Sequence, residues 1–292
     1  AIQGGQPLKG IDYTPPVASA QIKSCVLLAG LYADGVTRVT EPGVSRDHTE
    51  RMLSAFGVII EREARTLSIV GGQALQAADV AVPADLSSAA FFIVGATIAE
   101  SSAIVLPGVG INPTRRGVLD ILKRMGADIR LHDERIQAGE PVADIEVRSA
   151  SLKGVDIGGD EVELAIDEFP AIFIAAACAE GTTRLTGAAE LRVKESDRIA
   201  VMADGLSRLG VDVRVAEDGL TIVGTATGAA FGGARIESHD DHRIAMAFAM
   251  AALRASAPIE IDDCDFVDTS FPGFVTLAGE AGLQIRASEV SR

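Results

Sequence analysis

Residues 202–223 read Met-Ala-Asp-Gly-Leu-Ser-Arg-Leu-Gly-Val-Asp-Val-Arg-Val-Ala-Glu-Asp-Gly-Leu-Thr-Ile-Val. The segment Met202–Leu209 has the composition of a helix, and Gly210 is the residue type that most readily takes the left-handed conformation that ends one. Two alternating segments, residues 211–215 and 220–223, flank a turn at residues 217–219. The stretch therefore predicts a helix that leads directly into a β-hairpin.

This junction of helix, glycine and strand recurs along the chain at intervals of about 70 residues. Upstream of each junction lies another helix, apolar and rich in small residues, and a short strand separates the two helices. With a strand before its first helix, each unit reads βαβαββ, and the chain holds about four units. The junction glycines are Gly57, Gly126, Gly210 and Gly282, each followed by a predicted strand, and the apolar helices are predicted at Ala18–Leu31, Ser87–Ala99, Asp167–Ala179 and Asp241–Leu253.

The apolar helices are small or apolar on nearly all sides, which is typical of helices buried within a domain. The second helix of each unit carries more charge and is expected on the outside. Four such repeats could form a scaffold without any chemistry. The placement of uncommon polar residues argues against that interpretation.

Composition limits the classes of function. The chain has 292 residues, 48% of them hydrophobic, which is enough for two compact units with cores of their own. A net charge of -15 argues against general binding to nucleic acid or to an anionic membrane surface. Apolar runs such as Ala171–Ala179 are shorter than the roughly 20 residues of a membrane span. We therefore expect no nucleic-acid partner and no membrane segment.

The cysteines do not have the spacing of a metal or disulfide motif. Cys25, Cys178 and Cys264 lie far apart within apolar runs, which predicts reduced core residues of a cytoplasmic protein. Residues 239–242, His-Asp-Asp-His, could suggest a metal site, but consecutive residues rarely converge on one ion. Helix capping by the aspartates is the favoured interpretation, and neither a metal nor a cofactor is expected.

Polar residues gather at the N-termini of the apolar helices, where free N–H groups and the positive end of the helix dipole favour anions. Examples are Ser19 with Gln21, Asp167 with Glu168, and the run 240–243. The run 190–198, Glu-Leu-Arg-Val-Lys-Glu-Ser-Asp-Arg, adds two like charges four positions apart, with a carboxylate between them. Like charges at this spacing repel mildly on a helix, so the run suggests a bound anion.

Each of these features also has an ordinary structural interpretation. Ser19 and Asp167 could be simple helix caps, and Lys194, Glu195 and Arg198 could form a solvated helix start. Asp47 and Glu50 have the spacing of a capping box.

Five short motifs occur in order: Val-Ala-Ser-Ala-Gln at 17–21, Asp-Glu-Phe-Pro at 167–170, Leu-Arg-Val-Lys-Glu-Ser-Asp-Arg at 191–198, Asp-His-Arg at 241–243 and Thr-Ser-Phe-Pro at 269–272. Together they resemble the 5-enolpyruvylshikimate-3-phosphate synthase family, and the resemblance covers the whole chain. The Ser-Ala-Gln and Thr-Ser-Phe-Pro forms resemble the glyphosate-tolerant class of that family.

The resemblance implies an α/β (α+β) fold, an inverse α/β barrel of two domains that each hold three βαβαββ units. Four of six units are found here, so the resemblance also implies a missing N-terminal segment with further ligands. Residues 1–83 would be the remainder of the second, inserted domain, and residues 84–292 the bulk of the first.

The implied reaction transfers the enolpyruvyl group of phosphoenolpyruvate to the 5-hydroxyl of shikimate-3-phosphate and releases phosphate. The resemblance assigns proton transfer to two carboxylates and substrate binding to the polar and basic residues of the motifs. Asp167 and Glu195 are the catalytic candidates; Ser19, Ala20, Gln21, Arg46, Asp167 and Lys194 are expected to bind shikimate-3-phosphate; and Gln21, Arg198 and Arg243 are expected to bind phosphoenolpyruvate.

Two positions depart from the pattern of better-known family members. Thr269 or Ser270 stands where many have a lysine, and Glu190 stands where they have an asparagine. Two alternatives remain open: enolpyruvyl transfer to UDP-N-acetylglucosamine, and a fragment that is inactive without its N-terminal segment.

Overall fold

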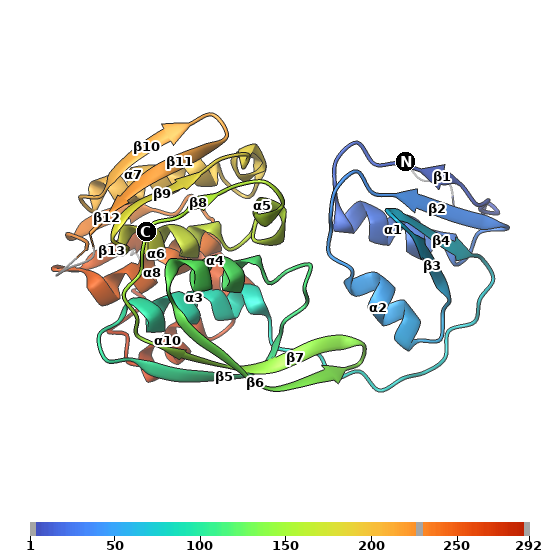
Figure 1. Ribbon diagram of the computed structural model, residues 1–292, viewed down its shortest axis with the longest axis horizontal. Helices are drawn as coiled ribbons and strands as arrows, with labels where there is room; N and C mark the ends of the chain where they lie inside the picture. The colour runs from blue at the N-terminus through green and yellow to red at the C-terminus, as the bar shows by residue number, and fades with distance from the viewer. Residues whose placement is uncertain (1–3, 226–229, 289–292) are drawn as a thin grey trace. The chain divides into compact units, whose positions relative to one another are not determined.

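The computed structural model describes residues 4–225 and 230–288, and its elements are shown in Figure 1. By contacts the chain forms two compact units. The first comprises Ala1–Pro83, Gly110–Arg115 and Asp133–Ala143, and the second comprises Ala84–Val109, Arg116–His132 and Asp144–Arg292. The strands β6 (Asp128–Gln137) and β7 (Glu140–Arg148) each pass from one unit into the other. The domain boundaries 1–83 and 84–292 remain a prediction. In the structure, two short stretches beyond residue 83, Gly110–Arg115 and Asp133–Ala143, pack with residues 1–83.

The first unit has the predicted βαβαββ order. Its parallel pair β1–β2 continues into antiparallel pairs, giving the sheet order β1-β2-β4-β3. Its elements are β1 (Asp12–Tyr13), α1 (Ala20–Gly30), β2 (Val36–Thr40), α2 (His48–Ala55), β3 (Ile60–Glu63) and β4 (Thr66–Val70).

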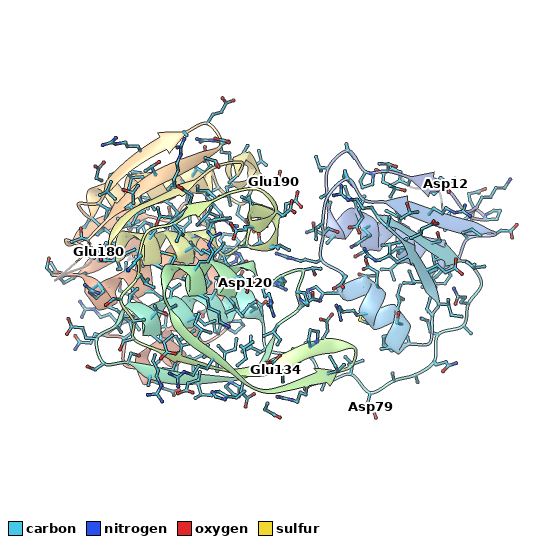
Figure 2. All side chains as sticks on the ribbon, viewed as in Figure 1. Asp12, Asp79, Asp120, Glu134, Glu180 and Glu190 are labelled. Carbon is cyan, nitrogen blue, oxygen red and sulfur yellow. The ribbon has the colours of Figure 1, made fainter. Side chains whose placement is uncertain are left out.

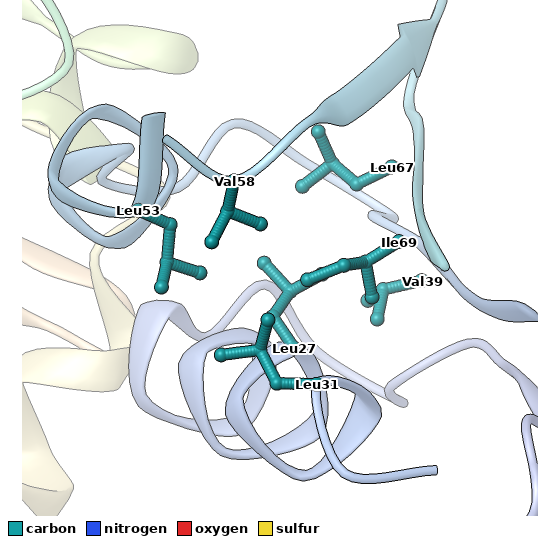
Figure 3. Packing of buried hydrophobic residues seen from close by; sticks show 7 residues of the cluster. All are labelled: Leu27, Leu31, Val39, Leu53, Val58, Leu67 and Ile69. Carbon is teal, nitrogen blue, oxygen red and sulfur yellow. The ribbon is translucent and has the colours of Figure 1, made fainter. Parts of the chain in front are cut away.

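The core of this unit lies between α1, α2 and the sheet (Figure 3). Alternate residues of β2 and β4 point into it, which puts Val39 opposite Leu67 in the register of the pair. The buried cluster consists of Leu27, Leu31, Val39, Leu53, Val58, Leu67 and Ile69.

Helix α1 is buried on one face and exposed on the other, although the sequence predicts a helix buried on all sides. Leu27 is fully buried, whereas Leu28 is 44% exposed, and Tyr32, which follows the helix C-cap, is 78% exposed. The helix packs one face on β2 and β4 of its own sheet. The apolar residues of the opposite face therefore remain in contact with solvent.

A buried ion cluster connects α1 with α2. The Lys23 ammonium is fully buried and lies 3.0 Å from Glu41 Oε1 and 2.8 Å from Glu50 Oε1. The predicted capping box is wrong, because Glu50 faces Lys23 and, within the described part of the chain, the Asp47 side chain makes no capping hydrogen bond to α2. Asp47 instead accepts hydrogen bonds from Arg51 and Asn112.

The second unit repeats the arrangement of the first. Its sheet, in the order β8 (Asp156–Ile157), β9 (Gly181–Leu185), β11 (Gly219–Gly224) and β10 (Asp212–Ala216), has a parallel first pair and antiparallel later pairs, as β1-β2-β4-β3 does. Its further elements are α3 (Leu86–Ile98), β5 (Ala103–Gly110), α4 (Gly117–Met125), α5 (Asp160–Leu164), α6 (Phe169–Ala177), the 3-10 helix η1 (Ala189–Val193), α7 (Arg198–Arg208), β12 (Ala234–Glu237), α8 (His242–Ala251), the 3-10 helix η2 (Ala252–Arg254), β13 (Ile259–Asp262), α9 (Asp265–Ser270) and α10 (Phe274–Glu280).

The apolar helices α3, α6 and α8 pack on one another in this unit. Their residues are buried on nearly all sides, as the sequence predicts, because each helix contacts two others of the same kind. Two of the predicted site residues of the unit, Asp167 and Arg243, lie at the N-termini of α6 and α8.

The four junction glycines have the predicted left-handed conformation, with φ values of 81° at Gly57, 102° at Gly126, 91° at Gly210 and 104° at Gly282. The strand predicted after Gly282 is wrong, since residues 283–288 contain no strand. The short helices α5 and α9 have too few turns to leave a periodic signal in the sequence.

The cysteine prediction is partly wrong. All three thiols are free, but only Cys178 is buried, whereas Cys25 and Cys264 are exposed. Burial raises the pKa of the Cys178 thiol to about 12. Exposed carboxylates such as Asp12, Glu180 and Glu190 occur in both units and account for part of the net negative charge (Figure 2). Among the described residues, no helix has the length and apolar character needed to cross a membrane.

Candidate active site

The second unit brings Asp167, Lys194, Glu195, Arg198 and Arg243 into one cluster. They lie at or next to the N-termini of α6, α7 and α8, where backbone N–H groups are free to bind anions. Asp167 lies between the two basic groups of the run 194–198, with Oδ1 3.9 Å from Lys194 Nζ and 3.6 Å from Arg198 Nη1.

Arg198 is the centre of this cluster. Its side chain is fully buried, and its Nε and Nη2 donate hydrogen bonds to Asp241 at 2.8 and 3.3 Å. Nη2 also donates to Glu195 Oε2 at 2.6 Å. Among the described residues, Nη1 makes no hydrogen bond. The guanidinium is therefore held rigidly, and Nη1, 3.6 Å from Asp167 Oδ1, is its one nitrogen without a hydrogen bond among the described residues.

The structure corrects the prediction that Lys194 and Arg198 lie on one helix start. Asp197 is the N-cap of α7 and accepts a hydrogen bond from the Ala200 N–H, so α7 begins at Arg198 and Lys194 precedes it. Lys194 lies 3.8 Å from Glu190 Oε1, the residue that departs from the family pattern. The surface-helix interpretation also fails for Arg198, because that side chain is buried rather than solvated.

For Asp241 the sequence predicted a place at a helix N-terminus and a capping role, but no partner side chain. Asp241 does cap α8, because its side chain accepts from the Arg243 N–H at 3.0 Å, but it is also the main partner of Arg198. Burial by itself would raise the pKa of Asp241, but the hydrogen bonds and charge of Arg198, with a hydrogen bond from Ser196, lower that pKa below its ordinary value. Asp241 opens the Asp-His-Arg motif at 241–243, but nothing local in that motif signals its pairing with Arg198.

Arg243 and the N-termini of α3 and α8 line a pocket of about 240 Å³. The pocket is also lined by Ser87, His242 and Ser270. Either Ser270 or its neighbour Thr269 stands at the position where many family members have a lysine. Burial, together with the charge of Arg243, lowers the pKa of His242. The pocket is therefore polar, with Arg243 as its cation.

The candidates of the first unit lie at the N-termini of α1 and α2. Ser19 caps α1 by accepting from the Ile22 N–H at 3.3 Å, and Ala20 and Gln21 form the first turn. Arg46 is half-buried in the loop before α2. Ser45 in the same loop donates a hydrogen bond to Glu41, a member of the buried ion cluster.

The sequence profile of the family described as EPSP synthase (3-phosphoshikimate 1-carboxyvinyltransferase) matches residues 1–277. The chain belongs to the EPSP synthase family. Similar relatives are named 3-phosphoshikimate 1-carboxyvinyltransferase: the protein of Alkalilimnicola ehrlichii is 63% identical over 284 residues, and that of Halorhodospira halophila is 61% identical over 284 residues.

Solved EPSP synthase structures have the same fold. The EPSP synthase of Acinetobacter baumannii superposes with a TM-score of 0.93 at 59% identity, over 98% of this chain and 65% of that one. The matches to the two relatives cover 97% of this chain but 63% of each relative. The chain thus spans less than two-thirds of the length of these EPSP synthases.

Proposed function

We propose that this chain provides part of the active site for transfer of the enolpyruvyl group of phosphoenolpyruvate to the 5-hydroxyl of shikimate-3-phosphate, with release of phosphate. The observation that carries the proposal is the buried Arg198, which is surrounded by three carboxylates and whose Nη1 has no hydrogen bond to any part of the chain that the structure describes. A fixed guanidinium beside carboxylates suits a reaction that needs both anion binding and proton transfer.

In the proposed reaction, the methylene carbon of phosphoenolpyruvate gains a proton while the hydroxyl oxygen attacks the adjacent carbon and loses its own proton. The tetrahedral product then loses phosphate and a methyl proton, which restores the double bond. Asp167 receives the proton of the attacking hydroxyl. Glu195 transfers the proton that the methylene carbon gains in the first step and that the methyl group loses in the second. The half-exposed side chain of Glu195 supports this role, since it can reach both Arg198 and solvent.

The binding roles follow the distribution of charge. Arg198 and Arg243 bind phosphoenolpyruvate, for which planar guanidinium groups offer bidentate contacts that lysine cannot copy. Lys194 binds shikimate-3-phosphate beside Asp167.

In the first unit, Ser19 and Gln21 contribute side chains and Ala20 its backbone, and Arg46 is a further phosphate ligand. The position of the first three residues at the free N–H groups of α1 supports an anion site there.

The acceptor is tested by assaying phosphate release with shikimate-3-phosphate and, separately, with UDP-N-acetylglucosamine. Phosphate release with shikimate-3-phosphate is expected. Turnover with the UDP-sugar and none with shikimate-3-phosphate would overturn the assignment of the substrate.

We further propose that the segment of the relatives that this chain does not span supplies the remaining ligands. The chain assayed by itself is expected to be at least about 100-fold less active than the chain mixed with that segment from the Alkalilimnicola ehrlichii relative, because the reactants would be incompletely positioned. Full activity without the segment would contradict this part of the proposal.

The proposal includes membership of the glyphosate-tolerant class and a cytoplasmic site of action. Ser270 in the pocket beside Arg243 supports the first, and three free thiols support the second. If the chain belongs to the glyphosate-tolerant class, we expect turnover to persist at glyphosate concentrations that stop a sensitive EPSP synthase.

A further inference from the structure

Glu168 is a buried carboxylate to which the proposed reaction gives no role. It follows Asp167, and its side chain is 1% exposed. Burial of a carboxylate is unfavourable unless its charge and lone pairs find partners. The residue is the N-cap of α6, where the positive end of the helix dipole stabilises a negative charge. Two of its other partners come from two further helices.

The first partner is Ser87, in the first turn of α3, whose hydroxyl donates a hydrogen bond to Glu168 Oε1. This hydroxyl is not needed to cap its own helix. Asp85 caps α3 instead, by accepting from the N–H groups of Ser87 and Ser88 at 3.2 and 3.1 Å. Ser87 therefore fixes the orientation of the Glu168 carboxylate.

The second partner is Arg243, in the first turn of α8. Its Nη1 lies 3.9 Å from Glu168 Oε1 and donates a hydrogen bond of 3.2 Å to the Asp167 carbonyl oxygen. Two consecutive residues thus hold the same edge of the guanidinium. Arg243 also lines the 240 Å³ pocket together with Ser270.

We propose that Glu168 is a positioning residue that, held by Ser87, fixes the Arg243 guanidinium for binding an anion in this pocket. The inference rests on the proposed function, in which that anion is phosphoenolpyruvate. An arginine that is already ordered loses less rotamer entropy when its ligand binds. The connection also couples the N-termini of α3, α6 and α8, so the three helices set the direction of one cation.

Positioning and simple charge predict opposite effects. The negative charge of Glu168 repels an anion in the pocket, so a purely electrostatic role predicts that its removal tightens anion binding. A positioning role predicts that its removal weakens binding, because Arg243 is then free to adopt other rotamers. The neutral, isosteric Glu168→Gln substitution therefore distinguishes the two.

The experiment is isothermal titration with phosphoenolpyruvate of the 292-residue chain, complemented with the segment of its relatives that it does not span. Glu168→Gln is expected to weaken binding about tenfold and Ser87→Ala about threefold, with no further loss from Glu168→Gln when Arg243→Gln is already present. Glu180→Gln is the matched control, since it removes the same charge from an exposed site. Unchanged or tighter binding in Glu168→Gln would overturn the inference. So would a Glu168→Gln substitution that weakens binding by the same factor whether or not Arg243→Gln is present.

Arginine side-chain NMR gives a second measurement that needs no ligand. Rotation about the Nε–Cζ bond of Arg243 is expected to be slow in the unsubstituted chain and faster in both Glu168→Gln and Ser87→Ala. Equal rotation in all three would also overturn the inference. If the unsubstituted chain binds no phosphoenolpyruvate even with that segment added, the proposed function fails, and NMR still decides whether Glu168 fixes Arg243. If Glu168→Gln does not fold, Ser87→Ala provides the same comparison.

Discussion

Arg198 carries the positive charge around which the residues of the candidate site are arranged. Three carboxylates approach it, and they differ in their contact with solvent: Asp241 is fully buried, Asp167 is 18% exposed and Glu195 is 51% exposed. An incoming anion must replace some of this negative charge beside the guanidinium. Because Glu195 is the most exposed of the three, it is the partner that can move at the smallest cost.

The Glu195→Gln substitution tests this carboxylate at the residue scale. In the chain complemented with the segment of its relatives that it does not span, we expect kcat to fall by about 10²–10⁴, because the amide cannot transfer the proton. The KM for phosphoenolpyruvate should change little, and the melting temperature should stay within about 2 °C, since Gln can still accept a hydrogen bond from Arg198. Steady-state kinetics and thermal unfolding provide both values. A weaker KM with unchanged kcat would assign Glu195 to binding instead.

Asp241 gives a pH dependence with a definite sign. Its pKa is lower in the folded chain than the ordinary value of 3.8, so the folded state favours the carboxylate. The stability that it contributes is complete above the unfolded pKa and is lost as pH falls from about 4 through the lower folded pKa.

Urea unfolding between about pH 2.5 and pH 6 measures this contribution. Asp241→Asn, which can still cap α8, is expected to be less stable by a constant amount above about pH 5. The difference from the unsubstituted chain should shrink below about pH 4. A difference that does not depend on pH would mean that the charge of Asp241 contributes nothing to folding.

The sequence predicted which charged residues are candidates for the site, but it did not predict their environments. The resemblance of the motifs to a known family, together with their places near helix N-termini, was sufficient to predict Asp167, Glu195, Arg198 and Arg243 as candidates. That Arg198 is buried and paired with Asp241 depends on the packing of α7 against α8, which has no local sequence signal. Lys23 is similar, since its two carboxylate partners, at positions 41 and 50, lie well beyond the reach of a local pattern.

At the scale of elements, α7 and α8 approach closely at a glycine. A Cβ atom at Gly205 would lie 2.3 Å from Cζ of the Phe248 ring, closer than any side chain can tolerate without displacement. This glycine lies inside α7, where its conformational freedom is itself unfavourable. The close approach explains why the helix has glycine at this position.

Gly205→Ala tests this packing. We expect it to destabilise the chain by about 1–3 kcal/mol through overpacking against Phe248, although alanine is the better helix former by about 1 kcal/mol. Gly279→Ala, in α10, is the matched control, because its added Cβ would have no described atom within 4 Å. That variant should be equally or more stable, by up to about 1 kcal/mol. Similar urea-unfolding free energies for the two variants would show that the helix contact is not tight.

The order of the elements was predictable because it repeats and because each repeat contains a glycine with left-handed conformation. The environment of α1 was not. Its sequence, like those of α3, α6 and α8, is rich in small and apolar residues, but the latter three contact one another, whereas α1 packs one face on its own sheet. Helix composition predicts what could be buried, and the number of neighbours decides what is buried.

At the scale of the whole chain, the first unit depends on residues well beyond position 83. Asn112 donates hydrogen bonds to Asp47 and Glu140 at 2.7 and 2.9 Å, and Glu140 lies 2.7 Å from His48 Nδ1. All four residues belong to the first unit. The polar cluster therefore joins segments that a cut after residue 83 would place on separate chains.

Separately expressed fragments 1–83 and 84–292 are expected to associate when they are refolded together. Asn112→Ala in the longer fragment should weaken the complex about tenfold, because Asp47 and Glu140 lose a shared donor. Glu134→Ala is the control. Glu134 lies in residues 133–143, which also belong to the first unit, but its side chain is exposed. Size-exclusion chromatography and titration measure the complex. Fragments that remain apart would show that the first unit does not need residues 110–115 and 133–143.

The exposed apolar face of α1 affects how stability varies with temperature. Unfolding raises the heat capacity in proportion to the apolar surface that becomes newly hydrated. Leu28 and, just after the helix, Tyr32 are already 44% and 78% exposed in the folded chain, so they add less to this change than buried residues do. Per residue, the first unit should therefore have a smaller heat-capacity change than the second, and its free energy of unfolding should curve less steeply between cold and hot conditions.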